Sequence, residues 1–254
     1  MGYPKDLLAS RSIIEHGKYA LIAPEGLVNN VIPGFENCII SILGSPKLGA
    51  SFVDYIVTMQ KDGKNSEGFG GQEDVETFVY VIEGKIKAAA GEKEFVLDES
   101  GYLYCPPGTK MYLENQSDGD SKLFLYKQKY RPLEGRRPWV HSNHANNIEF
   151  RIYDDMHNVH LKDLLPADID FDMNFHILSF DPAASHPFIE THVQEHGAYL
   201  LSGEGMYNLD NQWVPVKKGD YIFMGPYVHQ AAYAVGRESL TYVYSKDCNR
   251  DASL

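Results

Sequence analysis

The feature that most constrains the fold of this chain is an internal repeat. The stretch TFVYVIEGKIKAAAGEKEFVLDESGYLYCPPG, which begins at Thr77, matches GAYLLSGEGMYNLDNQWVPVKKGDYIFMGP, which begins at Gly197. In each copy a hairpin follows a Glu-Gly or Ser-Gly pair, and a second glycine opens another strand, 17 residues after Gly84 and 16 residues after Gly203. About 80 residues recur, so the chain of 254 residues contains two copies of one unit.

Short runs of β-branched and aromatic residues, bounded by Gly, Pro, Asn and Asp, fill both copies and are typical of strands. Helical periodicity is confined to Lys5–Ser12 and His160–Leu165, which we expect to be helical. Strand pairs closed by glycine-rich turns are typical of jelly-roll barrels, so we predict an all-β protein. The expected strands are Phe52–Met59, Glu76–Ile82, Lys85–Ala89, Glu94–Leu97, Leu123–Tyr126, Phe175–Phe180, Ala198–Leu201, Met206–Leu209, Trp213–Val216, Tyr221–Met224 and Leu240–Tyr244.

The formal net charge of −12 argues against a nucleic-acid partner, because phosphate binding requires a concentrated basic surface. No apolar run approaches the roughly 18 residues that cross a membrane, so we expect no membrane contact. The start of the chain has no apolar signal core, and three cysteines without a C-x-x-C pair suit a reducing compartment. We therefore expect a cytoplasmic protein whose partner is a small molecule or a cation.

Three potential metal ligands stand close together in the second copy, as Glu190-x-His192-x3-His196. Residues 190 and 192 share one face of a strand because side chains alternate, and residue 196 can rejoin that face on the hairpin partner or past a bend. Three nitrogen and oxygen donors at the mouth of a barrel would form an open metal site. Outside a barrel the same spacing more often marks ordinary histidines and a rim charge, so the prediction depends on the duplicated frame.

These residues resemble the motifs of the cupin superfamily. The stretch from Glu190 to Gly203 has the spacing of the first cupin motif, with Glu and His exchanged between its outer positions, and Gly219–Pro226 resembles the second motif. The resemblance implies a bicupin, with two jelly-roll barrels of the double-stranded β-helix type. We expect an N-terminal arm and barrel in residues 1–135, a linker in 136–165, where Pro, Gly and Asn suit an exposed connection, and a metal-binding barrel in 166–254.

The first copy lacks the corresponding ligands. No histidine occurs around residues 72–76, and Met111 stands where the second motif would place its metal histidine. We expect the N-terminal barrel to be a metal-free scaffold with a role in packing or in oligomer contacts.

A closer resemblance is to the bicupin (S)-ureidoglycine aminohydrolases of purine and allantoin breakdown. It is carried by IETHVQEHGAYLLSGEGMYNL, WVPVKKGDYIFMGPYVHQ and YVYSKDCNR, and extends more weakly over the whole chain. Spacing alone does not choose between His229 and Gln230 as fourth ligand, because adjacent strand residues face opposite ways. The resemblance implies Mn(II) held by Glu190, His192, His196 and Gln230. This oxygen-rich set without thiolate agrees with Mn(II) or Fe(II), and another divalent metal could also bind.

The family also suggests Tyr207, Tyr242 and Lys246 as substrate-binding residues. Tyr242 and Lys246 share strand parity, so both could face the metal. A lysine beside a dication is desolvated and repelled, which suits it to proton transfer, and makes Lys246 a catalytic candidate together with Glu190. The alternatives are barrel packing for the tyrosines and an exposed charge for the lysine. His186, shortly before Glu190, is expected near the mouth of the site.

The reaction that the resemblance implies is hydrolysis of a C–N bond. Ammonia would leave the α-carbon of (S)-ureidoglycine to give (S)-ureidoglycolate in allantoin degradation, with Lys246 or a water on the metal moving the protons. Two alternatives remain: another metal-dependent cupin enzyme, such as a dioxygenase, decarboxylase or isomerase, and a non-enzymatic bicupin that binds a small molecule. Barrels of this type commonly associate through edge strands, so we expect a homo-oligomer.

Overall fold

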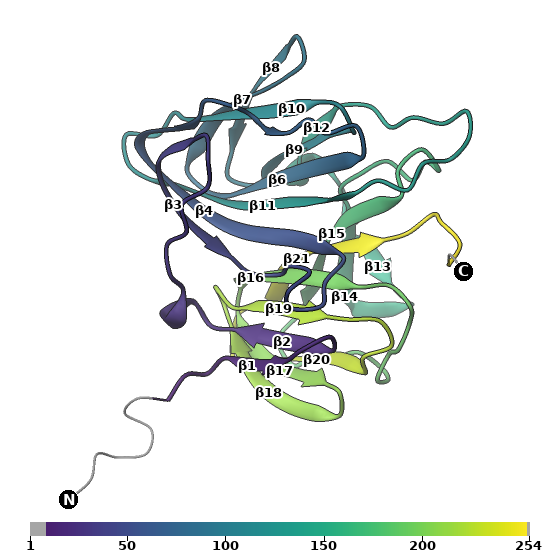
Figure 1. Cartoon of the computed structure of the whole chain (residues 1–254). Helices are drawn as coiled ribbons and strands as arrows, with labels where there is room; N and C mark the ends of the chain where they lie inside the picture. The colour runs from purple at the N-terminus through teal and green to yellow at the C-terminus, as the bar shows by residue number, and fades with distance from the viewer. Residues whose placement is uncertain (1–8, 253–254) are drawn as a thin grey trace, which may run out of the picture.

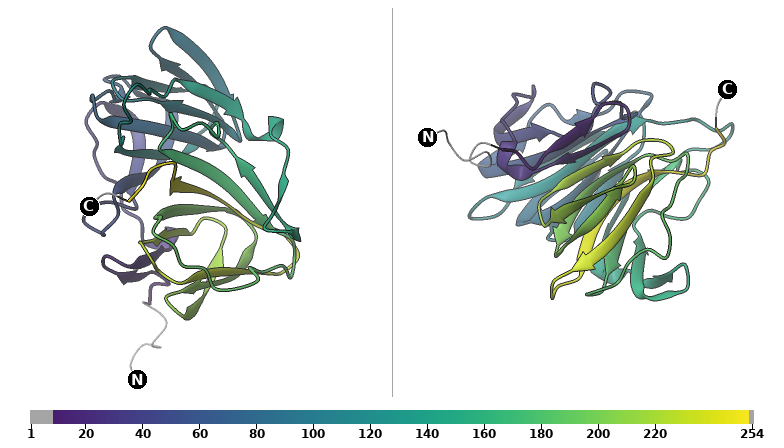
Figure 2. Two further views of the ribbon diagram at one scale, coloured as in Figure 1. Left: turned by 90° about the vertical axis from the view of Figure 1, so that its right-hand side faces the viewer. Right: turned by 90° about the horizontal axis from the view of Figure 1, so that it is seen from below.

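A computed structural model of the chain describes residues 9–252, and these residues are almost entirely in β-strands and loops. The only helical segments among them are two 3₁₀ turns, η1 (Pro24–Gly26) and η2 (Ala145–Asn147). None of the described helices has the length and apolar character to span a bilayer. Figure 1 shows two stacked halves, with the N-terminal half above the C-terminal half, and Figure 2 shows the same arrangement from the side and from below. The prediction of an all-β, duplicated barrel is confirmed.

The N-terminal half is one ten-stranded sheet. Its strands are β3 (Phe35–Ile42), β4 (Phe52–Asn65), β5 (Phe69–Gly70), β6 (Val75–Glu83), β7 (Lys85–Ala90), β8 (Lys93–Asp98), β9 (Gly101–Cys105), β10 (Lys110–Asn115), β11 (Ser121–Lys129) and β12 (His141–His144). Their order is β12-β9-β6-β11-β4-β10-β7-β8, with β3 paired to β4 and β5 to β10. The sheet encloses an apolar core of its own, in which Met111 is fully buried.

The C-terminal half contains two sheets and receives the start of the chain. Its strands are β1 (Ile13–Glu15), β2 (Tyr19–Ile22), β13 (Arg151–Tyr153), β14 (Met156–Asp163), β15 (Met173–Phe180), β16 (His196–Ser202), β17 (Glu204–Leu209), β18 (Gln212–Lys217), β19 (Tyr221–Met224), β20 (Gln230–Val235) and β21 (Leu240–Asp247). One sheet has the order β1-β2-β19-β16-β21-β15-β14-β13, and the other β18-β17-β20. Because β2 pairs with β19, the N-terminal arm extends the sheet of the opposite half.

All eleven predicted strands are present, but the predicted helices are not confirmed. His160–Leu165 is not helical, because β14 continues to Asp163 and pairs with β15. Val159 and Leu161 are buried on this strand, so the period is two, and a short apolar run cannot separate that period from a helical one. Ala9–Ser12 are not helical either, and the rest of Lys5–Ser12 lies outside the described residues.

The segment 136–165 is more regular than an exposed connection. Its first strand, β12, pairs with β9 of the N-terminal half, while β14 pairs with β15 of the C-terminal half. The chain therefore passes from one sheet to the other through paired strands. The domain boundaries placed at residues 135 and 165 stay a prediction.

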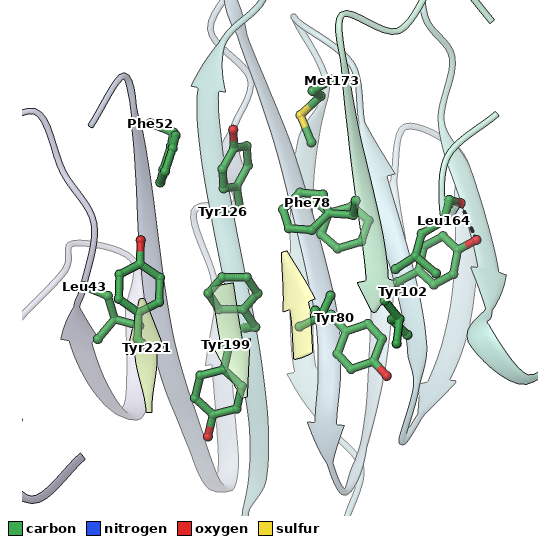
Figure 3. Packing of buried hydrophobic residues seen from close by; sticks show 14 of the residues in the cluster. Leu43, Phe52, Phe78, Tyr80, Tyr102, Tyr126, Leu164, Met173, Tyr199 and Tyr221 are labelled. Atoms are coloured by element: carbon green, nitrogen blue, oxygen red, sulfur yellow. Dashed lines mark hydrogen bonds between the residues drawn. The ribbon is translucent and has the colours of Figure 1, made fainter. Parts of the chain in front are cut away.

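The two halves pack face to face through a core of aromatic side chains. Phe78 stacks on Phe175 with ring centroids 3.8 Å apart, and Tyr126 meets Phe175 edge-on at 5.0 Å. Each fully buried side chain of this size contributes roughly 1.5–3 kcal/mol relative to exposure. This interface fixes the position of the C-terminal sheet against the N-terminal one. Among the side chains that Figure 3 labels in this core are Phe52, Phe78, Tyr80, Tyr102, Tyr126, Tyr199 and Tyr221.

Two buried carboxyl groups lie at the edge of this core. Glu76 on β6 accepts hydrogen bonds from the Tyr104 hydroxyl and from Nε2 of Gln128, and its carboxyl lies within hydrogen-bonding reach of Asp172 in the C-terminal half. Burial, together with the charge of Asp172, raises the pKa of Glu76 well above its usual range. The pair therefore shares one proton across the interface.

This shared proton makes stability depend on pH. The folded state keeps a proton that the unfolded chain releases near the ordinary Glu pKa of 4.5, so stability is lost as pH rises from there toward the folded pKa. The free energy of unfolding is expected to fall by up to about 1.4 kcal/mol per pH unit over this window. Glu76→Gln removes the ionisation at nearly constant volume and should flatten the decline. Thermal unfolding followed by circular dichroism across this pH range measures it, with the exposed Glu94→Gln as control; parallel declines in Glu76→Gln and wild type would contradict the shared proton.

Candidate active site

The structure brings the four predicted metal ligands together at one end of the C-terminal half. His196 is the first residue of β16 and Gln230 the first of β20. Glu190 forms an isolated antiparallel bridge with Gln230 through two backbone hydrogen bonds of 2.8 and 3.0 Å. His192 follows two residues later on the same connection. Three separate segments of the chain thus meet at this place.

The two histidines are oriented by backbone carbonyls. Nδ1 of His196 donates to the carbonyl oxygen of Ser245 at 2.8 Å, and Nδ1 of His192 to that of Gln194 at 3.1 Å. Since a carbonyl can only accept, each ring carries its proton on Nδ1 and has a lone pair on Nε2. The two Nε2 atoms lie 3.2 Å apart, and Nε2 of Gln230 lies 2.6 Å from that of His192. Two lone pairs that face each other at this distance favour a shared cation.

The buried amide of Gln230 offers a further donor atom at the same place. Its Oε1 atom has no hydrogen-bond partner, which costs about 1–3 kcal/mol for a buried acceptor. Within residues 9–252 no group of three or more His, Cys, Asp or Glu side chains is arranged to hold a metal. The nearer carboxylate oxygen of Glu190 lies 4.0 Å from Nε2 of His192, and the donor types of the four residues fit a hard or borderline divalent ion.

Glu190 is instead held by neighbours outside the predicted set. The Tyr153 hydroxyl donates to its Oε1 at 3.0 Å, and Nε2 of His186 lies 3.4 Å from the same oxygen. Burial raises the pKa of Glu190, while the Tyr153 hydrogen bond and the positive charge of Lys246 oppose this rise. Burial lowers the pKa of His186 to about 4, so this ring is neutral near pH 7. The carboxyl group of Glu190 is thus in contact with the Tyr153 hydroxyl and with the neutral imidazole of His186.

The predicted substrate-binding residues also lie at this site. The hydroxyls of Tyr207 on β17 and Tyr242 on β21 are 3.5 Å apart, and both side chains are buried. Lys246, near the end of β21, is half-buried. Burial lowers the pKa of His192 and of His196, and the positive charge of Lys246 lowers both further.

Glu190 and Tyr153 separate two spaces. An inner cavity of about 20 Å³ lies between Glu190, His196 and the tyrosines, which is room for one water molecule or ion. An open groove of about 540 Å³ lies on the other side and carries Arg151, Asp154 and the exposed Phe188. The groove has room for a small organic molecule, and Glu190 and Tyr153 line both spaces.

The structure also separates His229 from Gln230. His229 is half-exposed, with its Nδ1 3.7 Å from Asp210, and does not line the inner cavity, whereas Gln230 does. His186 was expected near the mouth of the site, and the structure places it beside the inner cavity. Tyr153, which also lines this cavity, was not predicted from the sequence. No local signal marks Tyr153, which lies in the segment expected to be a linker.

Comparison with known proteins agrees with this geometry. A family model described as Cupin domain matches residues 176–244. The chain is 60% identical over 254 residues to (S)-ureidoglycine aminohydrolase of Escherichia coli strain K12, covering 100% of this chain and 97% of that protein. The chain belongs to the (S)-ureidoglycine aminohydrolase family. As a member of this family it is an enzyme, a hydrolase acting on a C–N bond, which confirms the prediction from the sequence.

Two solved structures superimpose on most or all of this chain. The crystal structure of the protein YlbA from E. coli superimposes with a TM-score of 0.89 at 58% identity and covers 100% of both chains. Oxalate decarboxylase of Bacillus subtilis, described with Mn(II) centres, superimposes with a TM-score of 0.67 at 11% identity, covering 94% of this chain and 79% of that one. The second likeness shows a shared fold.

Removing the Tyr153 hydroxyl tests the description of Glu190. Because its hydrogen bond opposes the rise that burial causes, Tyr153→Phe is expected to raise the pKa of Glu190 further. Carbon-13 NMR titration of glutamate carboxyls in the metal-free protein measures this, with Glu190→Gln to assign the signal. An unchanged or lower pKa would show that the hydrogen bond does not act on the carboxylate.

Proposed function

We propose that this chain is a manganese-dependent enzyme that hydrolyses (S)-ureidoglycine to (S)-ureidoglycolate and ammonia in allantoin degradation. The observation that carries the proposal is the convergence of the Nε2 atoms of His192 and His196 with the side-chain amide of Gln230, whose Oε1 has no hydrogen-bond partner. The chain that contains these residues is 60% identical over its whole length to the (S)-ureidoglycine aminohydrolase of E. coli.

Glu190, His192, His196 and Gln230 would hold the metal. When bound, the ion would supply a positive charge that binds and orients the substrate carboxylate. Two oxygen donors, two imidazoles and no thiolate support Mn(II) or Fe(II), and the Mn(II) centres named for a decarboxylase of the same fold support manganese.

The reaction breaks the bond between the α-carbon and its amine and forms a bond to a water oxygen, without oxidation or reduction. One proton of the water must end on the leaving amine. The Lys246 ammonium would donate a proton to that amine, and the Glu190 carboxylate would accept one from water, after which the proton returns from Glu190 to Lys246. Positioned proton transfer of this kind contributes typically a hundred- to ten-thousand-fold to a rate.

The two spaces suggest how the substrate lies. The inner cavity of about 20 Å³ cannot hold a ureido acid, so the ureido group would extend into the groove past Glu190. The hydroxyls of Tyr207 and Tyr242 offer a polar wall inside the cavity, while Leu178 and Met224 restrict the water that enters it. Contacts on both sides of the α-carbon would explain selectivity for one stereoisomer.

Proton NMR of (S)-ureidoglycine, generated in place because it is labile, tests the activity. The manganese-loaded protein is expected to give (S)-ureidoglycolate and ammonia stereospecifically, and Glu190→Ala should lose both the rate and the stereochemistry. Racemic product at the spontaneous rate would contradict the substrate assignment. Oxygen uptake by the iron-loaded protein would then support a dioxygenase of the same fold.

Replacing Lys246 separates proton transfer from metal binding. Lys246→Met keeps the length of the side chain but removes the ammonium, so kcat is expected to fall by about a hundredfold or more. The affinity for Mn(II) should be retained or improve, because a positive charge beside the metal is removed. Steady-state kinetics and Mn(II) titration measure both, with the exposed Lys93→Met of β8 as control. A fall in kcat that follows lost metal binding would contradict a role in proton transfer.

Two further properties are proposed from the sequence. The charge and the cysteine pattern support a cytoplasmic location, and the edge strands of the sheets support a homo-oligomer. Sedimentation of the purified protein measures the oligomeric state.

A further inference from the structure

The N-terminal half has no assigned role in the reaction, yet it contacts the residues on both sides of His196. Ser51, at the start of β4, donates its backbone N–H to Oε2 of Glu195 at 2.9 Å. Asp54 on the same strand lies against Gly197, where an added Cβ atom would overlap Oδ2 of Asp54. Both residues that flank His196 are therefore held by the opposite half of the molecule.

We infer that Asp54 is a positioning residue of the metal centre, which holds the start of β16 so that His196 presents its Nε2 to the site. This inference rests on the proposed role of His196 as a metal ligand. It gives the metal-free half a function, namely to support the ligand strand from behind.

The alternation of side chains explains why an interface residue can act on an interior ligand. In β16, His196 and Ala198 face the inside of the C-terminal half, so Gly197 faces the N-terminal half. In β4, Phe52 and Ile56 belong to the core between the halves, and Asp54 lies between them on the same face. A displacement of residue 197 away from Asp54 therefore carries the neighbouring imidazole with it.

The Asp54 carboxyl is itself fixed on the interface. It is fully buried, and its Oδ2 accepts a hydrogen bond of 2.6 Å from the Tyr221 hydroxyl of β19, the strand that pairs with β16. Gly44 leaves space for that hydroxyl, because a Cβ atom there would overlap it. Two glycines thus admit one hydrogen-bonded pair that spans the two halves, an arrangement that packing of apolar residues alone does not require.

The same backbone segment is tied to β21 on its other side. Gly197 donates its N–H to Oγ of Ser245 at 3.1 Å, and the carbonyl oxygen of Ser245 accepts from Nδ1 of His196 at 2.8 Å. Glu195 donates its N–H to Oδ1 of Asp247 at 3.0 Å. Asp54 on one side and β21 on the other therefore confine both the position and the tautomer of the imidazole.

The test compares two hydroxyls that cross the same interface. Tyr221→Phe removes the donor to Asp54, and Tyr102→Phe removes a buried hydroxyl that donates to the carbonyl oxygen of Leu164, away from the site. Outer hydrogen-bond partners of metal ligands typically alter affinity by ten- to a hundredfold. Tyr221→Phe and Asp54→Ala are expected to raise the Kd for Mn(II) at least about tenfold. Asp54→Asn, which can still accept the hydrogen bond, should restore it, and Tyr102→Phe should leave it unchanged.

Electron paramagnetic resonance titration of free Mn(II) measures these affinities in the full-length protein. Wild-type affinity in both Tyr221→Phe and Asp54→Ala would overturn the inference, as would equal losses in Tyr221→Phe and Tyr102→Phe. Nitrogen-15 NMR of the imidazoles in the metal-free protein supplies a second readout that needs no metal. The signal of His196 should show one Nδ1–H tautomer in wild type and a mixture in Asp54→Ala. If wild type itself bound no divalent metal, the proposed metal site would fail, and an unchanged His196 tautomer would overturn the inference about Asp54 separately.

Discussion

The packing of two aromatic sheet faces against each other is the interaction on which the rest of this structure depends. Each half has its own apolar core, but Phe78, Phe124 and Tyr126 on one side and Phe175 and Tyr199 on the other also pack against the opposite half. Separating the halves would expose these rings to water, so pairing stabilises both copies. The strands that carry this interface, β15, β16 and β21, also carry or border the candidate site.

Duplication followed by divergence explains why the candidate active site lies in one half and why the other half is a scaffold. In the N-terminal half the interior at Met111 is apolar and fully buried, so this half is stabilised by ordinary packing. In the C-terminal half the corresponding interior contains imidazoles, a carboxyl, an amide and tyrosine hydroxyls, and Oε1 of Gln230 among them has no hydrogen-bond partner. Burial of such groups is unfavourable unless they are paired, so a rigid neighbouring half helps to keep them in place.

The sequence predicted strands in both copies of the repeat and missed others, among them those in the segment between the copies. All eleven predicted strands are present, whereas β12, β13 and β14 lie in a segment whose proline, glycine and asparagine content indicated a linker. The helix predicted at His160–Leu165 is wrong because pairing with β15 decides the conformation of this short run, whose apolar pattern fits either a helix or a strand.

The residues of the candidate site were likewise predicted only in part. The motif spacing predicted Glu190, His192 and His196, and strand parity on β21 predicted that Tyr242 and Lys246 share a face. Both patterns are local in the sequence. The choice between His229 and Gln230 depends on which residue the bridge to Glu190 turns inward, which spacing does not encode. Tyr153 and Asp54 could not be found from the sequence, since each acts on a residue far along the chain.

The central claim is that one divalent metal centre lies in the C-terminal half and is built from Glu190, His192, His196 and Gln230. A crystal structure of the manganese-loaded protein, with anomalous diffraction recorded above and below the manganese absorption edge, tests it most directly. The account predicts one anomalous peak per chain, between the Nε2 atoms of His192 and His196 and in contact with Glu190 and Gln230. A peak that rests on His229, a peak in the N-terminal half near Met111, or no ordered manganese at all would contradict it.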